Sequence, residues 1–188
     1  RVVMPEDASP YKKACARAYG AEVVDRGGTA ENREEVARAL QEETGYALIH
    51  PFDDPLVIAG QGTAGLELLA QAGRMGVFPE AVLAPVGGGG LLAGLATAVK
   101  ALSPTTLLLG VEPEVADDAR RSLEAGRLFR LEAPPRTRAD GVRTLSLGEH
   151  TFPILKEKAD GILVVSEEAI LEAERLLFTR TKQVVEPT

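Results

Sequence analysis

Hydrophobic positions along this chain follow two patterns. Short apolar runs of strand length alternate with segments whose apolar residues recur at helical spacing. Seven short runs have the length and composition of strands. In chain order they are Val2–Met4, Glu22–Asp25, Ala47–Ile49, Ala81–Val86, Thr106–Val111, Gly161–Val165 and Val184–Val185. Because helical segments separate most of these runs, the pattern predicts βαβ units and therefore an α/β fold with a parallel sheet.

Local signals mark where helices are expected to begin and end. Ser9-Pro10 and Asp54-Pro55 each place a capping side chain before a proline at the first helical position, and Ser166 precedes an acidic first turn. Glycines supply the stops. The predicted helices run from Pro10 to a stop at Gly20, over Ala30–Thr44 with a stop at Gly45, from Pro55 to about Ala72, over Leu91–Leu102, over Val115–Ala125 with a stop at Gly126, and onward from Ser166. Residues Leu131–Glu149 are expected to be irregular.

The polar segment around His50–Pro55 is the predicted boundary between two lobes. We interpret residues 1–50 as part of a smaller lobe and residues 51–188 as most of a larger lobe. The sequence starts at Arg1 directly before one apolar run and stops at Glu186-Pro187-Thr188 directly after another. Since natural domains seldom begin and end inside buried strands, we expect these residues to be a piece of a longer chain.

Charge and cysteine content exclude several classes of protein. The 188 residues carry 21 Lys and Arg against 28 Asp and Glu, a net charge of −7, with no basic run. That balance argues against a nucleic acid or an anionic membrane as partner, because either needs clustered basic side chains. A single cysteine excludes a disulfide framework and a multi-cysteine zinc site. With no apolar stretch of membrane-spanning length, we expect a soluble, cytoplasmic protein.

The strongest local signal for a binding site is the run of four glycines at Gly87–Gly90, between a predicted strand and a predicted helix. Glycines let backbone N–H groups approach a ligand, and the N-terminus of the following helix adds positive potential. The run matches neither a Walker A loop nor the G-x-G-x-x-G pattern. The alternative is a tight turn that lets helix and strand pack closely, but four glycines favour a site for phosphate or another anion.

Motifs along nearly the whole chain resemble one enzyme family. Gly87–Gly90 with Leu91 resembles the phosphate loop of fold-type II pyridoxal-phosphate enzymes, and in particular that of the threonine dehydratase and serine racemase family. Further motifs stand in the family's order: Met4-Pro5-Glu6, Ser9-Pro10 with Lys12-Lys13, His50–Pro55 followed by Ile58–Thr63, Glu112-Pro113, Ala116–Asp118, Ala139–Val142 and Glu186–Thr188. The resemblance implies open, twisted parallel sheets flanked by helices, as in the β subunit of tryptophan synthase, and a homodimer or higher homo-oligomer.

The family's chemistry supplies the expected function. Pyridoxal phosphate is an electron sink for charge at the α-carbon of an amino acid, and loss of the β-hydroxyl of L-threonine or L-serine then yields a 2-oxo acid and ammonia. The resemblance implies that the phosphate is held by the backbone N–H groups of Gly87, Gly88, Gly89, Gly90 and Leu91. It places Gly141 beside the pyridine ring and Glu186 near the cofactor. A serine or other amino-acid racemase is the alternative within the class, and a non-catalytic phosphate- or metal-binding fragment is the alternative outside it.

The lysine that anchors the cofactor is expected to lie outside this sequence. In the family it belongs to a Ser-Phe-Lys type motif upstream of the strand that corresponds to Met4-Pro5-Glu6, and the loop that grips the substrate carboxylate is upstream as well. Neither motif occurs in these 188 residues. We therefore assign no catalytic residue within the sequence and expect these residues alone not to catalyse the reaction.

Glu112, Ala116 and Asp118 are a second candidate site. Two carboxylates, the main-chain carbonyl of Ala116 and water form an oxygen-rich set that suits Mg²⁺, Ca²⁺ or Mn²⁺. By chemistry alone, acidic residues in a loop and a first helical turn are more often solvated or capping groups. Related family members carry a divalent-cation site at the matching positions, so the resemblance favours a metal site.

The other chemically active side chains have structural interpretations. Cys15 is interpreted as a small buried residue of the first helix. His50 and His150 have no Cys or His partner at metal-ligand spacing. Asp53 and Asp54 are interpreted as a turn residue and a helix cap.

Overall fold

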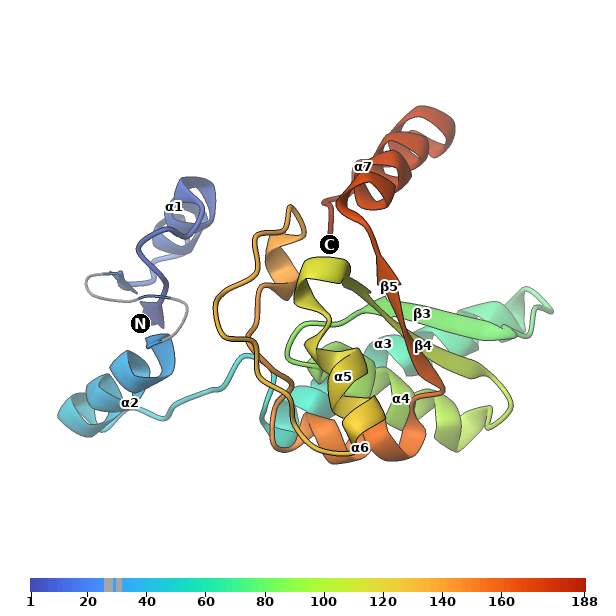
Figure 1. The fold of residues 1–188 in the computed structure, drawn as a ribbon, viewed down its shortest axis with the longest axis horizontal. Helices are drawn as coiled ribbons and strands as arrows, with labels where there is room; N and C mark the ends of the chain where they lie inside the picture. Colours follow the sequence, from blue (N-terminus) through green and yellow to red (C-terminus); the bar gives the residue numbers. More distant parts are fainter. Residues whose placement is uncertain (26–28, 30–31) are drawn as a thin grey trace. The chain divides into compact units, whose positions relative to one another are not determined.

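The computed structural model describes residues 1–25, 29 and 32–188, which form two compact units, Arg1–Ile49 and His50–Thr188 (Figure 1). A bilayer-spanning helix would need a longer apolar stretch than any helix in the described part of the chain provides. The candidate site residues from Gly87 onward all belong to the second unit.

The first unit is a small βαβ arrangement. Strands β1 (Val2–Val3) and β2 (Val23–Val24) pair in parallel, and α1 (Pro10–Ala18) connects them. Helix α2 (Arg33–Thr44) follows and ends at Gly45, whose φ of 69° is the left-handed conformation that the predicted stop requires. The predicted start of this helix at Ala30 lies outside the described residues.

One prediction holds in part in this unit and two fail. Ser9 and Pro10 occupy the predicted N-cap and first helical positions, but the Ser9 side chain accepts no capping hydrogen bond, so the start of α1 relies on Pro10, whose ring fixes a helical φ. Cys15 is only partly buried, because α1 has no fully buried residue. Residues Ala47–Ile49 form no strand: within the described residues no strand pairs with them, and Ile49 is 74% exposed.

The second unit is built on a three-stranded sheet. Strands β3 (Ala81–Pro85), β4 (Leu107–Pro113) and β5 (Gly161–Val165) pair in parallel in the order β3-β4-β5. Parallel pairing places the carboxyl ends of all three strands along one edge. In open α/β sheets this edge is where ligands bind.

Helices connect these strands and cover the sheet. Helix α3 (Pro55–Arg74) precedes β3, α4 (Gly90–Leu102) links β3 to β4, and α5 (Asp118–Ala125) and α6 (Thr151–Lys158) lie between β4 and β5. Helix α7 (Glu167–Leu176) follows β5. Short 3-10 segments at Glu114–Ala116 and Asp140–Val142 and a π-helical turn at Leu177–Thr181 complete the unit.

Helix α4 lies in the centre of the core. Leu92, Ala93, Ala96 and Val99 have no exposed surface, because α3 and α6 pack against this helix and the sheet covers it as well (Figure 1). This burial on several sides explains why the predicted helix is apolar nearly all round. Helix α3 comes so close that a Cβ atom at Gly94 would lie 2.5 Å from the Gly62 nitrogen.

Capping predictions in the second unit are confirmed where the cap is local. The Asp54 carboxylate accepts hydrogen bonds from the N–H groups of Leu56 and Val57 at 2.8 and 3.1 Å. Ser166 caps α7 through the N–H of Ala169, and Gly126 ends α5 at a φ of 66°. Strand β5 has its predicted bounds.

Other predicted elements differ from the structure. Val184–Val185 is not a strand, since it pairs with no strand of the described residues and Val184 is 86% exposed. The predicted helix over Val115–Ala125 is interrupted at Asp117, and its α-helical part begins only at Asp118. Helix α6 was not predicted.

An ion pair ties α4 to the sheet. The Asp160 carboxylate, which directly precedes β5, accepts hydrogen bonds from the Lys100 ammonium at 2.7 Å and the Leu108 N–H at 2.6 Å. These two donors, Lys100 above all, hold the pKa of Asp160 below its usual range. The carboxylate therefore joins the end of α4 to the starts of β4 and β5.

We predict that Asp160→Asn lowers the free energy of unfolding of the full-length protein by about 1–2 kcal/mol at neutral pH. Hydrogen bonds to a charged group contribute about 1.5–3 kcal/mol, and partial exposure of this pair reduces that contribution. Because the folded pKa is lowered, this stabilisation is present above the unfolded pKa and is lost as the pH falls through the folded pKa. Urea unfolding of both proteins from about pH 7 to about pH 2 measures the difference. Glu157→Gln is the control, since Glu157 is exposed and pairs with its neighbour Lys158. A difference that stays constant into acid would contradict the prediction.

Candidate functional site

The glycine turn lies at the carboxyl end of β3 and leads directly into α4. Gly88, Gly89 and Gly90 are buried, and Gly89 has a φ of 88°, which side-chain-bearing residues rarely adopt. Within the described residues no side chain caps α4. The N–H groups of its first turn, which by helix geometry have no intrahelical acceptor, are therefore available to a ligand.

Close packing also requires glycine in this turn. A Cβ atom at Gly88 would overlap the Phe52 ring, and one at Gly90 would lie 2.9 Å from the Phe52 Cβ atom. At Gly89 a Cβ atom would lie 2.9 Å from the Leu147 side chain. The two interpretations of the glycine run are therefore compatible, because the packing that excludes side chains also leaves the N–H groups bare.

The N-termini of three helices meet at this turn. Phe52, just before α3, packs on Gly88, and Thr151, the first residue of α6, donates a hydrogen bond to the Gly88 carbonyl at 2.7 Å. Asp54 caps α3, and the Asp53 carboxylate accepts hydrogen bonds from the N–H groups of His150, just before α6, and Thr151, its first residue. Among the three, only α4 keeps uncompensated positive potential at its N-terminus.

Two later segments lie against the turn. A Cβ atom at Gly87 would lie 3.0 Å from the Val142 Cα atom and 3.5 Å from the Gly141 carbonyl. The Gly141 N–H in turn donates to the Thr188 hydroxyl at 3.1 Å. The structure thus brings the glycine turn, Gly141 and the segment that contains Glu186 together at one edge of the sheet, although Glu186 itself is exposed.

Thr144 is a residue of this site that sequence reasoning missed. Its side chain is 92% buried, since its exposed fraction is 8%, and its hydroxyl has no hydrogen-bond partner among the described residues. The hydroxyl lies 3.4 Å from the position of a Cβ atom at Gly87. It is therefore a donor that a ligand on the turn could engage. Because the loop around Thr144 is irregular, no periodic pattern marks the residue.

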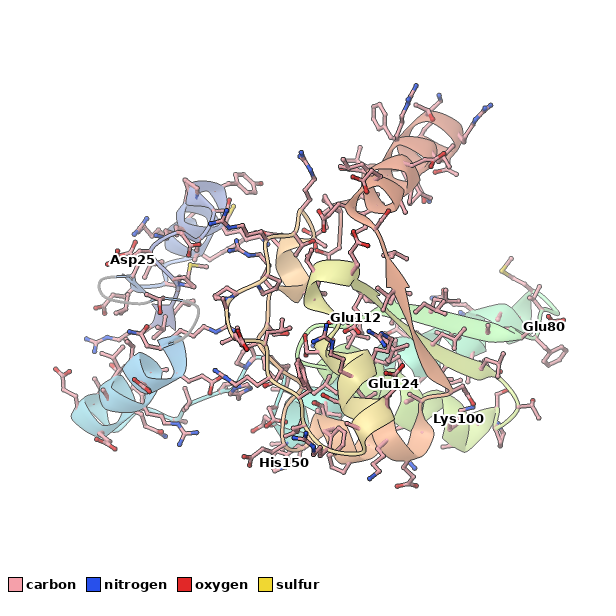
Figure 2. All side chains as sticks on the ribbon, viewed as in Figure 1. Asp25, Glu80, Lys100, Glu112, Glu124 and His150 are labelled. Atoms are coloured by element: carbon pink, nitrogen blue, oxygen red, sulfur yellow. The ribbon has the colours of Figure 1, made fainter. Side chains whose placement is uncertain are left out.

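The second candidate site contains two buried carboxyl groups near the start of α5. Glu112 is 1% exposed and Asp118 is 2% exposed. Glu112 accepts hydrogen bonds from the N–H groups of Ala119 at 3.1 Å and Arg120 at 2.9 Å, so it caps α5 (Figure 2). This cap explains why the α-helix begins at Asp118 instead of Val115.

Burial, and to a smaller extent repulsion from a neighbouring carboxylate, disfavours charge on each of these two groups. Burial above all raises the pKa of Glu112 to about 7, and burial together with the Glu112 charge raises the pKa of Asp118 to about 8. The Oδ2 atom of Asp118 is buried without a hydrogen-bond partner among the described residues. The neighbouring Asp117, in contrast, pairs with Arg120 and Arg121.

A cation between these carboxylates would satisfy the orphaned oxygen of Asp118 and offset the repulsion. The described residues contain no group of three or more His, Cys, Asp or Glu side chains placed to hold a metal. Any metal here would therefore depend on two carboxylates supplemented by backbone and water oxygens. Ala116, whose carbonyl is the predicted third ligand, is buried in the 3-10 turn between them.

The structure also assigns roles to residues that the sequence marked as structural. The His50 Nδ1 atom accepts the Asp53 N–H at 2.8 Å, and its ring packs edge-on against Phe52. The interpretation of Asp53 as a turn residue is incomplete, because its carboxylate also binds the backbone of Glu149, His150 and Thr151. Nothing in the local sequence around either segment indicates this pairing.

Comparison with known proteins finds relatives that are similar to the chain along nearly its whole length. The chain is 44% identical over 187 residues to the L-threo-3-hydroxyaspartate ammonia-lyase of Saccharomyces cerevisiae and 43% identical over 187 residues to the serine racemase of Homo sapiens. Both alignments cover 100% of this chain but 56% and 54% of the relatives. The chain thus spans about half the length of the curated relatives it matches.

A solved structure is closer in sequence. The T.th. threonine deaminase is 91% identical, and its structure superposes with a TM-score of 0.95 over 99% of this chain and 60% of that chain. The architecture is that of fold-type II enzymes, as the sequence predicted. The family model for pyridoxal-phosphate dependent enzymes matches residues 1–188. The chain has a parallel sheet with an uncapped glycine turn at its carboxyl edge, and the family model matches its full length. The chain therefore belongs to the pyridoxal-phosphate dependent enzyme family.

Proposed function

We propose that the protein carrying this chain converts L-threonine or L-serine to a 2-oxo acid and ammonia, with pyridoxal phosphate as cofactor. The observation that carries the proposal is the 91% identity with the T.th. threonine deaminase over 99% of the chain. The hydroxyl leaves as water and the nitrogen leaves as ammonia after water re-enters, so the net reaction needs no oxidant or reductant.

The turn has the properties that a phosphate needs. The backbone N–H groups of Gly87–Gly90 and Leu91 would hold the phosphate, and the Thr144 hydroxyl lies beside Gly87. Gly141 would lie beside the pyridine ring and Glu186 near the cofactor. When bound, pyridoxal phosphate supplies an electron sink for charge at the substrate α-carbon. The role of this chain's residues would be to hold the phosphate at the glycine turn, against which Phe52 and Val142 pack.

Amino-acid racemisation is the alternative reaction. It uses the same cofactor, and the chain is 43% identical to the serine racemase of Homo sapiens. Both reactions begin with loss of the α-proton, but racemisation returns a proton to the opposite face, whereas elimination expels the β-hydroxyl. Their products differ, so one experiment separates the two reactions. The 91% identity favours elimination.

We also propose that Glu112, the Ala116 carbonyl and Asp118 hold a divalent cation, Mg²⁺, Ca²⁺ or Mn²⁺. The support is the buried Asp118 oxygen that lacks a partner among the described residues, and the Glu112 carboxyl group near it, whose charge a cation would offset. Such an ion would fix the loop between β4 and α5. Binding of a metal without catalysis is the function that this second site supports by itself.

We predict that the full-length protein with pyridoxal phosphate releases ammonia from L-threonine together with 2-oxobutanoate, and from L-serine together with pyruvate. Quantifying the 2-oxo acids and the D-amino acids in the same reaction is the measurement. Accumulation of D-serine in excess of pyruvate would contradict the elimination proposal in favour of racemisation. Neither product, with no bound cofactor, would reject both enzyme proposals.

The glycine turn supplies a second prediction. Gly89→Ala forces a side chain into the left-handed region and against Leu147, Leu155 and Thr151, so we expect the affinity for pyridoxal phosphate to fall at least about tenfold. Gly73→Ala in α3 is the matched control, because a Cβ atom there meets nothing within 4 Å. Fluorescence titration of both variants with the cofactor, alongside thermal unfolding, is the measurement. Equal affinities of the two variants would argue against a phosphate site at the turn.

Metal addition supplies a third prediction. At saturating concentration, at least one of Mg²⁺, Ca²⁺ and Mn²⁺ should raise the unfolding temperature of the full-length protein by about 2 °C or more, and Asp118→Asn should abolish the shift because it removes the ligand charge. Glu124→Gln on the same helix is the control, since this side chain is exposed and pairs with Arg120 (Figure 2). Calorimetric scans with and without each ion measure the shift. An equal shift in the Asp118 variant would place the ion elsewhere.

A further inference from the structure

We propose that Thr151, held in place by Asp53, is a positioning residue that directs the N–H group of Gly89 toward the cofactor phosphate. The inference rests on the proposed function, since it concerns the phosphate anchor of the same site. It involves residues from α6 and from the segment before α3, which lie far from the glycine turn in sequence.

Thr151 binds the turn through a fully buried hydroxyl. Its side chain has no exposed surface, and its hydroxyl donates to the Gly88 carbonyl at 2.7 Å. The Gly148 N–H lies 3.2 Å from the same carbonyl and 2.9 Å from the Thr151 hydroxyl. The Gly88 carbonyl is therefore held toward α6 by two donors.

Holding this carbonyl also fixes the next N–H group. The peptide bond between Gly88 and Gly89 is planar and trans, because the described chain contains no cis peptide bond. In a trans peptide the C=O and N–H groups point in opposite directions. The N–H of Gly89 is therefore directed away from α6, on the side where the uncapped start of α4 leaves room for an anion.

The peptide between Gly88 and Gly89 needs hydrogen bonds from other segments to fix its orientation, because both of its residues are glycines. Without Cβ atoms, the peptide unit can rotate by about 180° at little steric cost. The rotated form would turn a carbonyl oxygen, in place of an N–H donor, toward the phosphate and repel it. The hydroxyl of Thr151 selects the productive orientation before the ligand arrives.

Asp53 places Thr151 in turn. Its Oδ1 atom accepts the N–H groups of His150 at 2.8 Å and Thr151 at 3.2 Å, and its Oδ2 atom accepts that of Glu149 at 2.9 Å. A Cβ atom at Gly148 would overlap this carboxylate. The carboxylate also compensates the positive N-terminus of α6. The position of α6 against the glycine turn is thus set by the Asp53 carboxylate, which lies far from α6 in the sequence.

The test compares two ligands that differ only in the phosphate group. We expect Thr151→Val, which keeps the shape but removes the hydroxyl, to lower the affinity of the full-length apoprotein for pyridoxal phosphate about tenfold. The affinity for pyridoxal, which has no phosphate, should change less than about twofold. Thr151→Ser keeps the hydroxyl and should retain the wild-type ratio of the two affinities. Fluorescence titration gives both values, and thermal unfolding checks that the variants are folded.

A solely structural role for Thr151 would lower both affinities alike or neither, and either result would overturn the inference. Asp53→Asn is a second variant, which weakens the cap but leaves the turn sequence intact. It should lower the ratio of the affinity for pyridoxal phosphate to the affinity for pyridoxal. An unchanged ratio would show that Asp53 does not act on the phosphate through Thr151. Wild-type protein that binds neither ligand would instead reject the proposed function itself, and with it the inference. The two failures are thus distinguishable.

Discussion

The close backbone contact between α3 and α4 is the constraint on which the candidate site depends. Gly62 and Gly94 bring the two helices together without intervening side chains, one turn or two from the start of each. Because the contact lies so near both N-termini, it also places Phe52 on the glycine turn. A side chain at either glycine would push α3 away and uncover the start of α4. The anion site that we propose is therefore a consequence of helix packing as much as of the turn itself.

The converging helices differ in how their N-terminal charge is satisfied. Asp54 caps α3 and Asp53 caps α6. Two carboxylates that are neighbours in the sequence therefore neutralise the positive ends of both helices. Helix α4 begins with glycine, and no side chain in the described part of the protein caps it. An anion near these helices is thus attracted to one N-terminus in particular. At the second site Glu112 caps α5, and there the unpartnered group is an acceptor, the Oδ2 atom of Asp118, which suits a cation.

Sequence reasoning located those features whose signals are local. The cap at Asp54, the cap at Ser166, the stop at Gly126 and the glycine turn each follow from neighbouring residues. Helix α6 was missed because its cap, Asp53, is 98 residues away from Thr151 in the chain. The strand predicted at Val184–Val185 failed for the opposite reason: its composition suits a strand, but strand formation needs a neighbour to pair with. The motif order indicated the fold-type II architecture, yet it gave no sign of Thr144, whose role arises only from its position beside Gly87.

A phosphate site made of backbone N–H groups, as proposed, is compatible with the similarity of this chain to relatives named for different reactions. Such donors recognise a phosphate through position and polarity, and they carry no information about the substrate side chain. A change of substrate or of reaction therefore requires no change in the turn, in its close packing or in the residues that orient it. The proposed site depends instead on glycine, which admits the conformation and the packing, and on groups such as Thr151 that hold a flexible peptide in one orientation. Specificity must then come from side chains that touch the substrate, which can vary while the anchor stays constant.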